Sequence, residues 1–88
     1  MNLTDQQIAA RAREGDAAAY VQLVERYRAP LIAYVWGLTG LRDDAEELAQ
    51  EAFCRVWEKL PTLRRRDLLV SWLYRIAHNL AVSAVRRP

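Results

Sequence analysis

Residues 43–60 read DDAEELAQEAFCRVWEKL, and this stretch gives the clearest indication of the fold. Its apolar residues recur every three or four positions, which is the spacing of one face of an α-helix. They are Ala45, Leu48, Ala49, Ala52, Phe53, Val56, Trp57 and Leu60. Pro61 follows directly, and proline lacks the backbone N–H that would continue a helix. We therefore predict an amphipathic helix over 43–60.

The start of this helix is rich in acidic residues. Asp43 and Asp44 are each followed by a glutamate three positions on, which is the spacing of two overlapping capping boxes. The four carboxylates also suit the positive end of the helix dipole. Mostly polar residues remain on the outer side, namely Glu47, Gln50, Glu51, Cys54, Arg55 and Glu58. This side is interpreted either as a solvated face or as a docking face for a basic or polar partner.

Two helices are predicted before this stretch. Thr4 and Gln7 have the spacing of a capping box, and Gly15 can adopt the left-handed conformation that ends a helix. Asp16 can then cap a second helix, whose apolar residues recur at helical spacing: Ala19, Tyr20, Leu23, Val24 and Tyr27. Pro30 removes a backbone donor, so we expect this second helix to be kinked or broken near Pro30 before it continues over 31–38.

A loop and a fourth helix are predicted after Leu60. The loop, 60–67, contains the run Arg64, Arg65 and Arg66, and Asp67 can cap a helix that extends to about Arg87. We expect this helix to bury Leu69, Leu73, Ile76, Leu80 and Ala84. Helical spacing places Ser71, Arg75, His78, Asn79, Val82 and Arg86 on the opposite side.

The fold class that follows is all-α, a small bundle of about four helices. Only three Gly and three Pro interrupt the 88 residues, and no run alternates apolar and polar residues like a strand. A composition of 52% apolar and 27% charged residues is typical of one soluble domain. A chain this short buries only about 60 to 65% of its unfolded surface, so binding is favoured over catalysis in a deep cavity.

The formal net charge of +2 is a sum of opposed blocks. Residues 43–58 carry six acidic side chains and one arginine, a net charge of −5. Residues 59–88 carry seven basic side chains and one aspartate, a net charge of +6. This separation predicts two surfaces with different partners, and the basic block suits a polyanion.

Catalytic and metal sites are not indicated. His78 is the only histidine, and its helical neighbours supply neither a carboxylate nor a serine for a catalytic triad. We therefore expect no enzyme, small-molecule substrate or cofactor. Cys54 is the only cysteine, which excludes an internal disulfide and leaves too few ligands for zinc. We expect neither a signal peptide nor a membrane span, and the cysteine usage suits the cytoplasm.

The fourth helix has the composition of a nucleic-acid-binding surface. Arg75, His78 and Asn79 share a face with Ser71 and Arg86, so side chains able to read bases lie between cations able to hold phosphates. The loop arginines extend this surface. Trp72 and Tyr74 fit either the core or stacking on an unpaired base, whereas Trp36 and Trp57 are expected in the core.

Two sequence motifs carry a resemblance to a known family. Residues 44–53 read DAEELAQEAF and are followed by Val56 and Trp57, and residues 71–81 read SWLYRIAHNLA before Arg86 and Arg87. In this order and at this separation they resemble region 2 of the extracytoplasmic-function (group 4) sigma factors of bacterial RNA polymerase. The likeness extends from Gly15 through Arg87 and implies a helical bundle.

The resemblance implies that the chain takes part in transcription initiation. It implies that Glu47, Gln50, Glu51 and Arg55 bind the clamp helices of the β′ subunit of core RNA polymerase. It also implies that the chain recognises and opens the −10 promoter element through single-stranded DNA contacts from Arg64, Arg65, Arg66, Ser71, Arg75, His78, Asn79, Arg86 and Arg87. Family analogy adds an anti-sigma protein as a partner, although no residue demonstrates one.

Two departures from the family pattern limit these expectations. The base-capturing loop of the family commonly has Arg-Gly-Asp-Ser and an aromatic residue, whereas this chain has Arg-Arg-Arg-Asp at 64–67 and then two leucines. The identity of the captured base therefore stays open. The second helical domain of the family, region 4, is absent from the 88 residues. We expect 1–88 to form a single region 2 domain, which belongs either to a longer sigma factor, the alternative we favour, or to a protein that works without region 4.

An interpretation from a different class is a helical protein-interaction module whose basic helix is only solvated. Binding to single-stranded DNA separates the two, because phosphate contacts give an affinity that falls steeply with salt.

Overall fold

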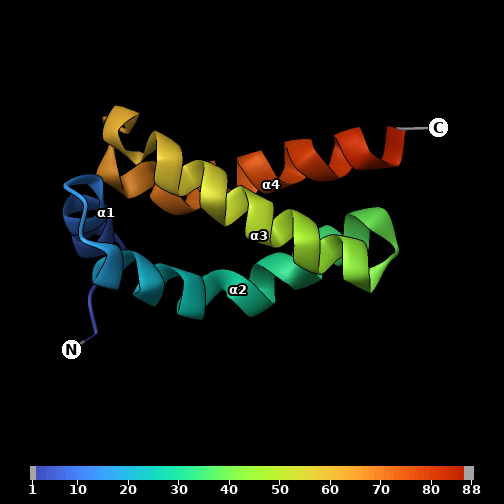
Figure 1. The fold of residues 1–88 in the computed structure, drawn as a ribbon, viewed down its shortest axis with the longest axis horizontal. Coiled ribbons are helices and arrows are strands. Elements are labelled where there is room, and N and C mark those ends of the chain that lie inside the picture. The colour runs from blue at the N-terminus through green and yellow to red at the C-terminus, as the bar shows by residue number, and fades with distance from the viewer. Residues whose placement is uncertain (1, 87–88) are drawn as a thin grey trace.

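The computed structural model describes residues 2–86 and shows four α-helices within them (Figure 1). These are α1 (Asp5–Arg13), α2 (Ala17–Thr39), α3 (Arg42–Lys59) and α4 (Leu69–Arg86). Two short 3₁₀ helices, η1 (Leu60–Thr62) and η2 (Arg66–Leu68), lie between α3 and α4. The described residues contain no strand, so the prediction of an all-α bundle is confirmed.

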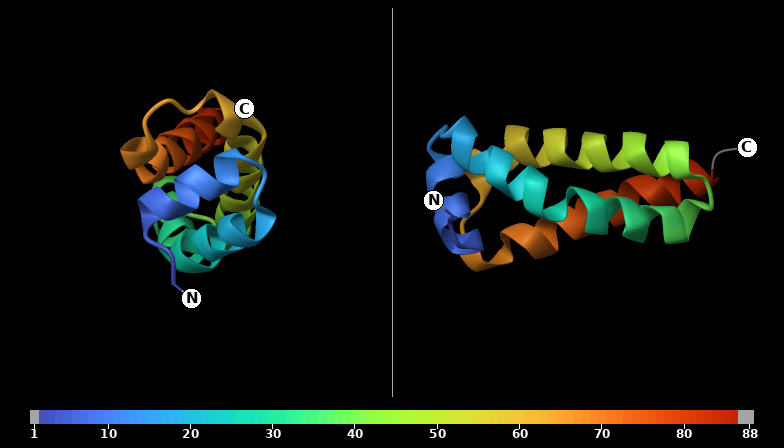
Figure 2. Two further views of the ribbon diagram at one scale, coloured as in Figure 1. Left: turned by 90° about the vertical axis from the view of Figure 1, so that its left-hand side faces the viewer. Right: turned by 90° about the horizontal axis from the view of Figure 1, so that it is seen from below.

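Three of the helices form the body of the bundle. α2, α3 and α4 extend along the long axis, and α1 packs across one end beside η1 and η2 (Figure 2). The molecule measures 40 × 25 × 18 Å along its principal axes. The α2–α3 turn lies at the end opposite α1, so the loop before α4 and the α2–α3 turn occupy opposite ends of the bundle (Figure 1).

The ends of α1 and α2 agree with the sequence. Thr4 and Gln7 form a complete capping box, with the Gln7 N–H donating to Thr4 Oγ1 at 3.1 Å and the Thr4 N–H donating to Gln7 Oε1 at 2.9 Å. Gly15 has a φ of +96°, and the Asp16 carboxylate accepts the Ala19 N–H at 3.1 Å. Gly40, with a φ of +78°, ends α2 in the left-handed conformation.

Pro30 does not break α2. The helix is continuous from Ala17 to Thr39, and its ribbon bends in the middle without interruption (Figure 1). Pro30 and Arg26 are both exposed, so water can hydrate the Arg26 carbonyl that lacks the usual N–H donor at position 30. Leu23 and Leu31 are fully buried on either side of the proline and anchor both halves in one core.

The predicted capping of α3 and α4 by aspartates is wrong. α3 begins one residue before Asp43, with Leu41 at the N-cap and no side-chain bond there, so Asp43 and Asp44 lie inside the first turn. Gly40 ends α2 directly before this start, and the carboxylates keep their favourable position near the helix dipole. Asp67 lies inside η2 and accepts hydrogen bonds from Arg65, at 2.8 Å for the shorter one.

The buried row of α4 differs from the predicted one. Leu69 and Leu73 are buried as expected, and the row continues through Ala77 and Ala81. The other predicted core residues, Ile76, Leu80 and Ala84, are half-buried at its edge. α3 likewise buries Ala45, Ala49 and Ala52. Alanines at these positions allow close approach of the helix backbones. Those of α3 were predicted in its apolar face, whereas Ala77 and Ala81 of α4 were not.

Trp36 and Trp57 are less buried than predicted. Trp36 is 45% exposed, which contradicts its expected place in the core, and the Arg42 guanidinium lies over its ring at 5.7 Å from the centroid. Trp57 is half-buried and packs on Tyr20, with ring centroids 5.1 Å apart. Trp72 is half-buried against the core. Aromatic rings therefore border this core, and aliphatic side chains and alanines fill most of its centre.

One stretch of the described residues is long and apolar enough, by length and composition alone, to cross a membrane. Arg66–Arg86 has a mean hydropathy of 1.3 in its most apolar window and is long enough to cross a bilayer. One such helix is weak evidence, because a core helix of a soluble protein meets the same criterion. α4 packs against α2 and α3, where it buries Leu69, Leu73, Ala77 and Ala81.

Tyrosine hydroxyls join elements that are distant in sequence. Tyr20 of α2 donates to the Phe53 carbonyl of α3 at 2.5 Å, and burial raises the pKa of its phenol. Tyr27 donates to the Asp5 carboxylate of α1, and Arg26 binds the same carboxylate at 2.8 Å. The hydrogen bond to Asp5 is the main cause that raises the pKa of Tyr27 from its ordinary 10.0 to about 12.

The raised pKa values of Tyr20 and Tyr27 predict that the protein loses stability in alkali. Both phenols hold their protons more tightly in the folded state, so the stabilisation is complete below about pH 10 and is lost as the pH rises through the folded pKa values. Urea unfolding followed by circular dichroism, from neutral pH to about pH 12, should show the free energy of unfolding falling. The variant Tyr20→Phe/Tyr27→Phe should have a shallower slope, and an equal slope would contradict the assignment.

Candidate nucleic-acid interface

α4 presents a polar stripe on the side opposite its buried row. Ser71, Arg75 and Asn79 are exposed at intervals of four residues, and Arg86 is exposed near the end of the helix. The buried row fixes this orientation, because rotation of α4 would expose Leu73 and bury charge. The structure therefore brings these four predicted DNA contacts together. Arg87, also predicted, lies outside the described residues.

His78 lies at the edge of this stripe that borders α2. Its Nδ1 atom is 2.9 Å from the Tyr34 hydroxyl, and its side chain is half-buried. Tyr74, one turn earlier, packs edge-on against Tyr34 with ring centroids 5.3 Å apart. Burial raises the pKa of the Tyr74 phenol. These contacts give His78 and Tyr74 a structural role between α2 and α4.

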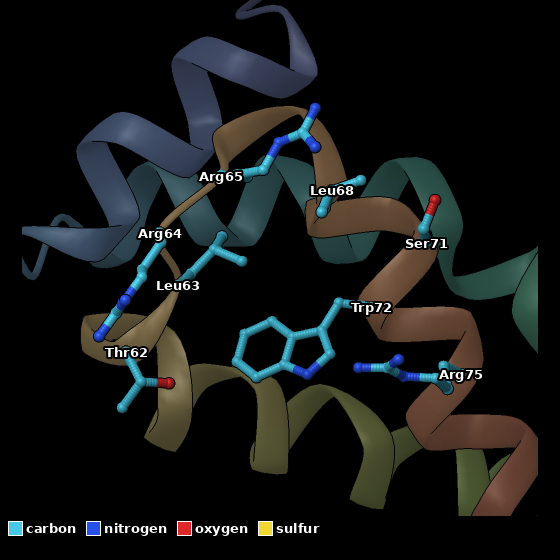
Figure 3. A pocket seen from close by; sticks show the side chains of 8 residues that line it. All are labelled: Thr62, Leu63, Arg64, Arg65, Leu68, Ser71, Trp72 and Arg75. Carbon is cyan, nitrogen blue, oxygen red and sulfur yellow. The ribbon is translucent and has the colours of Figure 1, made fainter.

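A pocket of about 470 Å³ lies where the loop meets the start of α4 (Figure 3). Its lining combines residues of the loop with residues of the exposed stripe: Thr62, Leu63, Arg64, Arg65, Leu68, Ser71, Trp72 and Arg75. The indole of Trp72 forms one wall, and the guanidinium of Arg75 extends toward it (Figure 3). Leu63 is 8% exposed and fixes the loop to the core.

The pocket carries an excess of positive charge. Arg65 is paired with Asp67, whereas no ion pair within residues 2–86 neutralises Arg64 or Arg75. A flat aromatic wall beside uncompensated guanidinium groups suits an unpaired base together with its phosphates. Arg66, the third predicted loop contact, is exposed in η2 and does not line the pocket.

A second, smaller hollow lies between α3 and α4. It has a volume of about 200 Å³ and is lined by Arg55, Lys59, Ile76, Asn79, Leu80 and Ser83. Asn79 belongs to the stripe of α4, and it also faces the basic residues of α3 across the hollow. Lys59 and Ser83 are not among the predicted contact residues. The four-residue spacing of Arg55 and Lys59 on one helix was the available signal.

The predicted docking residues of α3 are all exposed but spread across its outer side. Glu47 and Glu51 are exposed, and Gln50 lines a groove toward α2 that also contains Arg28 and Glu46. Arg55 lies at the opposite edge, in the hollow toward α4, and donates to Glu51 at 3.3 Å. The structure therefore groups the first three as an acidic and polar face and separates Arg55 from Gln50.

The described part of the chain offers no metal site, since no group of three or more His, Cys, Asp or Glu side chains within it could hold an ion. Cys54 is a free, exposed thiol on α3.

Comparison with known proteins places this chain in a family. The model of the sigma-70 region 2 family matches residues 23–88. The chain is 38% identical over 80 residues to the ECF RNA polymerase sigma factor SigG of Mycobacterium tuberculosis, a match that covers 86% of this chain and 21% of SigG. The chain therefore belongs to the sigma-70 region 2 family, as a region 2 domain of the extracytoplasmic-function type.

Other curated relatives agree. The chain is 36% identical over 90 residues to the ECF RNA polymerase sigma-E factor of Escherichia coli K12, covering 98% of this chain and 47% of that protein. It is 30% identical over 77 residues to SigW of Bacillus subtilis, covering 88% of this chain and 41% of SigW. The chain thus spans about half or less of the length of these relatives. No solved structure gives a significant match.

Proposed function

We propose that this chain is a non-enzymatic promoter-recognition domain that acts in complex with core RNA polymerase in the bacterial cytoplasm. In this proposal residues 1–88 form a single region 2 unit, which binds the β′ clamp helices and recognises and opens the −10 element. The observation that carries the proposal is the cationic pocket beside Trp72, continuous with the exposed Arg75 and Asn79 of α4. The family role in transcription initiation supports it.

The pocket suits the capture of one extruded base. Trp72 offers an aromatic surface on which a base can stack, and Arg64 and Arg75 can hold the flanking phosphates. Leu68 and Leu69 stand where family members commonly have an aromatic residue. Leu69 is buried and Leu68 lies on the pocket rim, so Trp72 supplies the aromatic contact in this chain.

Strand opening by this surface needs no chemical step. A domain that binds single-stranded DNA more tightly than duplex shifts the equilibrium toward the open state by that difference in affinity. Arg75 and Arg86 supply binding that does not depend on sequence, and the Asn79 amide supplies donors and an acceptor for a base edge.

The outer side of α3 suits a protein partner. Glu47, Gln50 and Glu51 are exposed, and the two carboxylates would repel DNA, so we assign this face to the β′ subunit. An anti-sigma protein that covers this face would keep the domain from the polymerase, and one that covers the basic stripe would keep it from promoter DNA.

A protein-interaction module is the second candidate function. An apolar groove of about 360 Å³ between α2 and α3, lined by Tyr20, Val21, Phe53 and Trp57 among others, favours a protein partner on this side. Binding of single-stranded DNA separates the two candidates.

Affinity for a single-stranded −10-like oligonucleotide should fall steeply with salt. Each phosphate contact contributes about 0.7 to the slope of log affinity against log salt concentration for single strands. Fluorescence anisotropy at several salt concentrations, with and without core polymerase, measures this slope. No detectable DNA binding even with core polymerase present would refute the proposal and leave the protein-interaction module.

Two substitutions in α4 should have different effects on sequence preference. Asn79→Ala should weaken binding of preferred oligonucleotides more than scrambled ones, at about 1 to 3 kcal/mol for a lost base contact. Arg86→Ala should weaken both to the same extent, because a phosphate contact carries no sequence information. Competition binding measures both ratios. Equal losses for Asn79→Ala on both oligonucleotides would remove the base-reading role from Asn79.

The double variant Gln50→Ala/Glu51→Arg should reduce capture of core polymerase in a pull-down. Both side chains are exposed, so the circular dichroism spectrum should not change. Glu14→Arg is the matched control, because Glu14 is an exposed acid at the end of α1. Undiminished capture by the double variant would place the polymerase interface elsewhere.

A further inference from the structure

The hollow between α3 and α4 has a chemistry of its own. Its two edges are polar, with Arg55 and Lys59 on α3 and Asn79 and Ser83 on α4. Its remaining lining, Ile76 and Leu80, is apolar and half-buried. The sugar of a nucleotide packs on apolar side chains, and its phosphate binds cations and hydroxyl or amide donors. The hollow offers both kinds of group.

The charges of the hollow differ from those of the rest of α3. Arg55 shares its charge with Glu51 at 3.3 Å, and both side chains are about half exposed, so the pairing is weak and solvent-screened. No acidic side chain within residues 2–86 is paired with Lys59. The acidic residues Glu47 and Glu58 do not line the hollow. The basic side of α3 therefore faces the basic helix α4, although the helix as a whole is acidic.

The hollow continues the line of the base pocket along α4. Ser71 and Arg75 border the pocket, and Asn79 and Ser83, two turns further on, border the hollow. Eight residues of helix correspond to about 12 Å at 1.5 Å per residue, a span that a few nucleotides cover. A strand with one base in the pocket can thus pass over the hollow without leaving the surface of α4.

We propose that this hollow binds the sugar–phosphate backbone of the strand whose base enters the pocket beside Trp72, with Arg55 and Lys59 as phosphate contacts. This inference rests on the proposed function and adds α3 to the DNA-binding surface. It moves Arg55 from the polymerase-docking face to the DNA interface. Asn79 then lies between the phosphates held by α3 and those held by α4, which positions its amide against a base.

The variants Arg55→Gln, Lys59→Gln and the double substitution test this inference. Both residues are exposed, so the variants should keep the wild-type circular dichroism spectrum and melting curve. Arg28→Gln is the matched control, because Arg28 is an exposed arginine in the groove on the α2 side of α3. The probes are a fluorescein-labelled single-stranded −10-like oligonucleotide and labelled oligo(dT).

The double variant should lower the slope of log affinity against log salt by about 1.4, or about 0.7 for each lost phosphate contact. The loss should be the same on both probes, and Arg28→Gln should retain the wild-type slope. Core-polymerase capture by Arg55→Gln should remain at the wild-type level.

Two results would overturn the inference. Both can be distinguished from the result that would refute the proposed function. A wild-type slope for the double variant would remove α3 from the DNA interface while the proposed function stands. Reduced polymerase capture by Arg55→Gln with an unchanged slope would return Arg55 to the docking face. Absence of oligonucleotide binding by the wild-type chain, with core polymerase present, would refute the proposed function and this inference together.

Discussion

The packing of α4 against α2 and α3 is the contact on which the rest of the structure depends. Leu69, Leu73, Ala77 and Ala81 form a buried row at intervals of four residues, and the two alanines allow close approach of the neighbouring helices. The row fixes the rotation of α4 about its axis. That rotation decides which side chains reach solvent, which face α3 and which border the loop. The pocket and the hollow are both consequences of it.

The boundary between the acidic and basic surfaces runs along α3 itself. Glu47 and Glu51 lie on its outer side, whereas Arg55 and Lys59 turn toward α4. Net charge by block of sequence assigns the whole helix to one surface, because it averages over all sides of the helix. The structure shows which side of the helix each charge occupies. A helix with an acidic composition can therefore still contribute cations to a basic surface.

The order and type of the elements could be predicted because local signals fixed them: the Thr4–Gln7 capping box, Asp16 and the left-handed Gly15. The errors arose where tertiary context decides. Leu41, not an aspartate, is the N-cap of α3, and the buried row of α4 continues through alanines, whereas the uninterrupted bend of α2 at Pro30 is one of the two outcomes expected there. For the candidate site, helical spacing predicted the stripe of α4. The spacing could not show that Lys59 lies opposite Asn79, because that depends on how two helices pack.

The position of α1 has a consequence for truncation. The family match begins at residue 23, inside α2, yet Leu3, Ile8 and Ala12 are buried in the same core as α4. α1 also contacts η1 and η2, which frame the loop of the base pocket. A protein shortened to the matched range would expose this apolar surface to water and leave the loop without support from α1. The smallest unit that keeps the pocket intact therefore includes α1, and the family match is shorter than the folding unit.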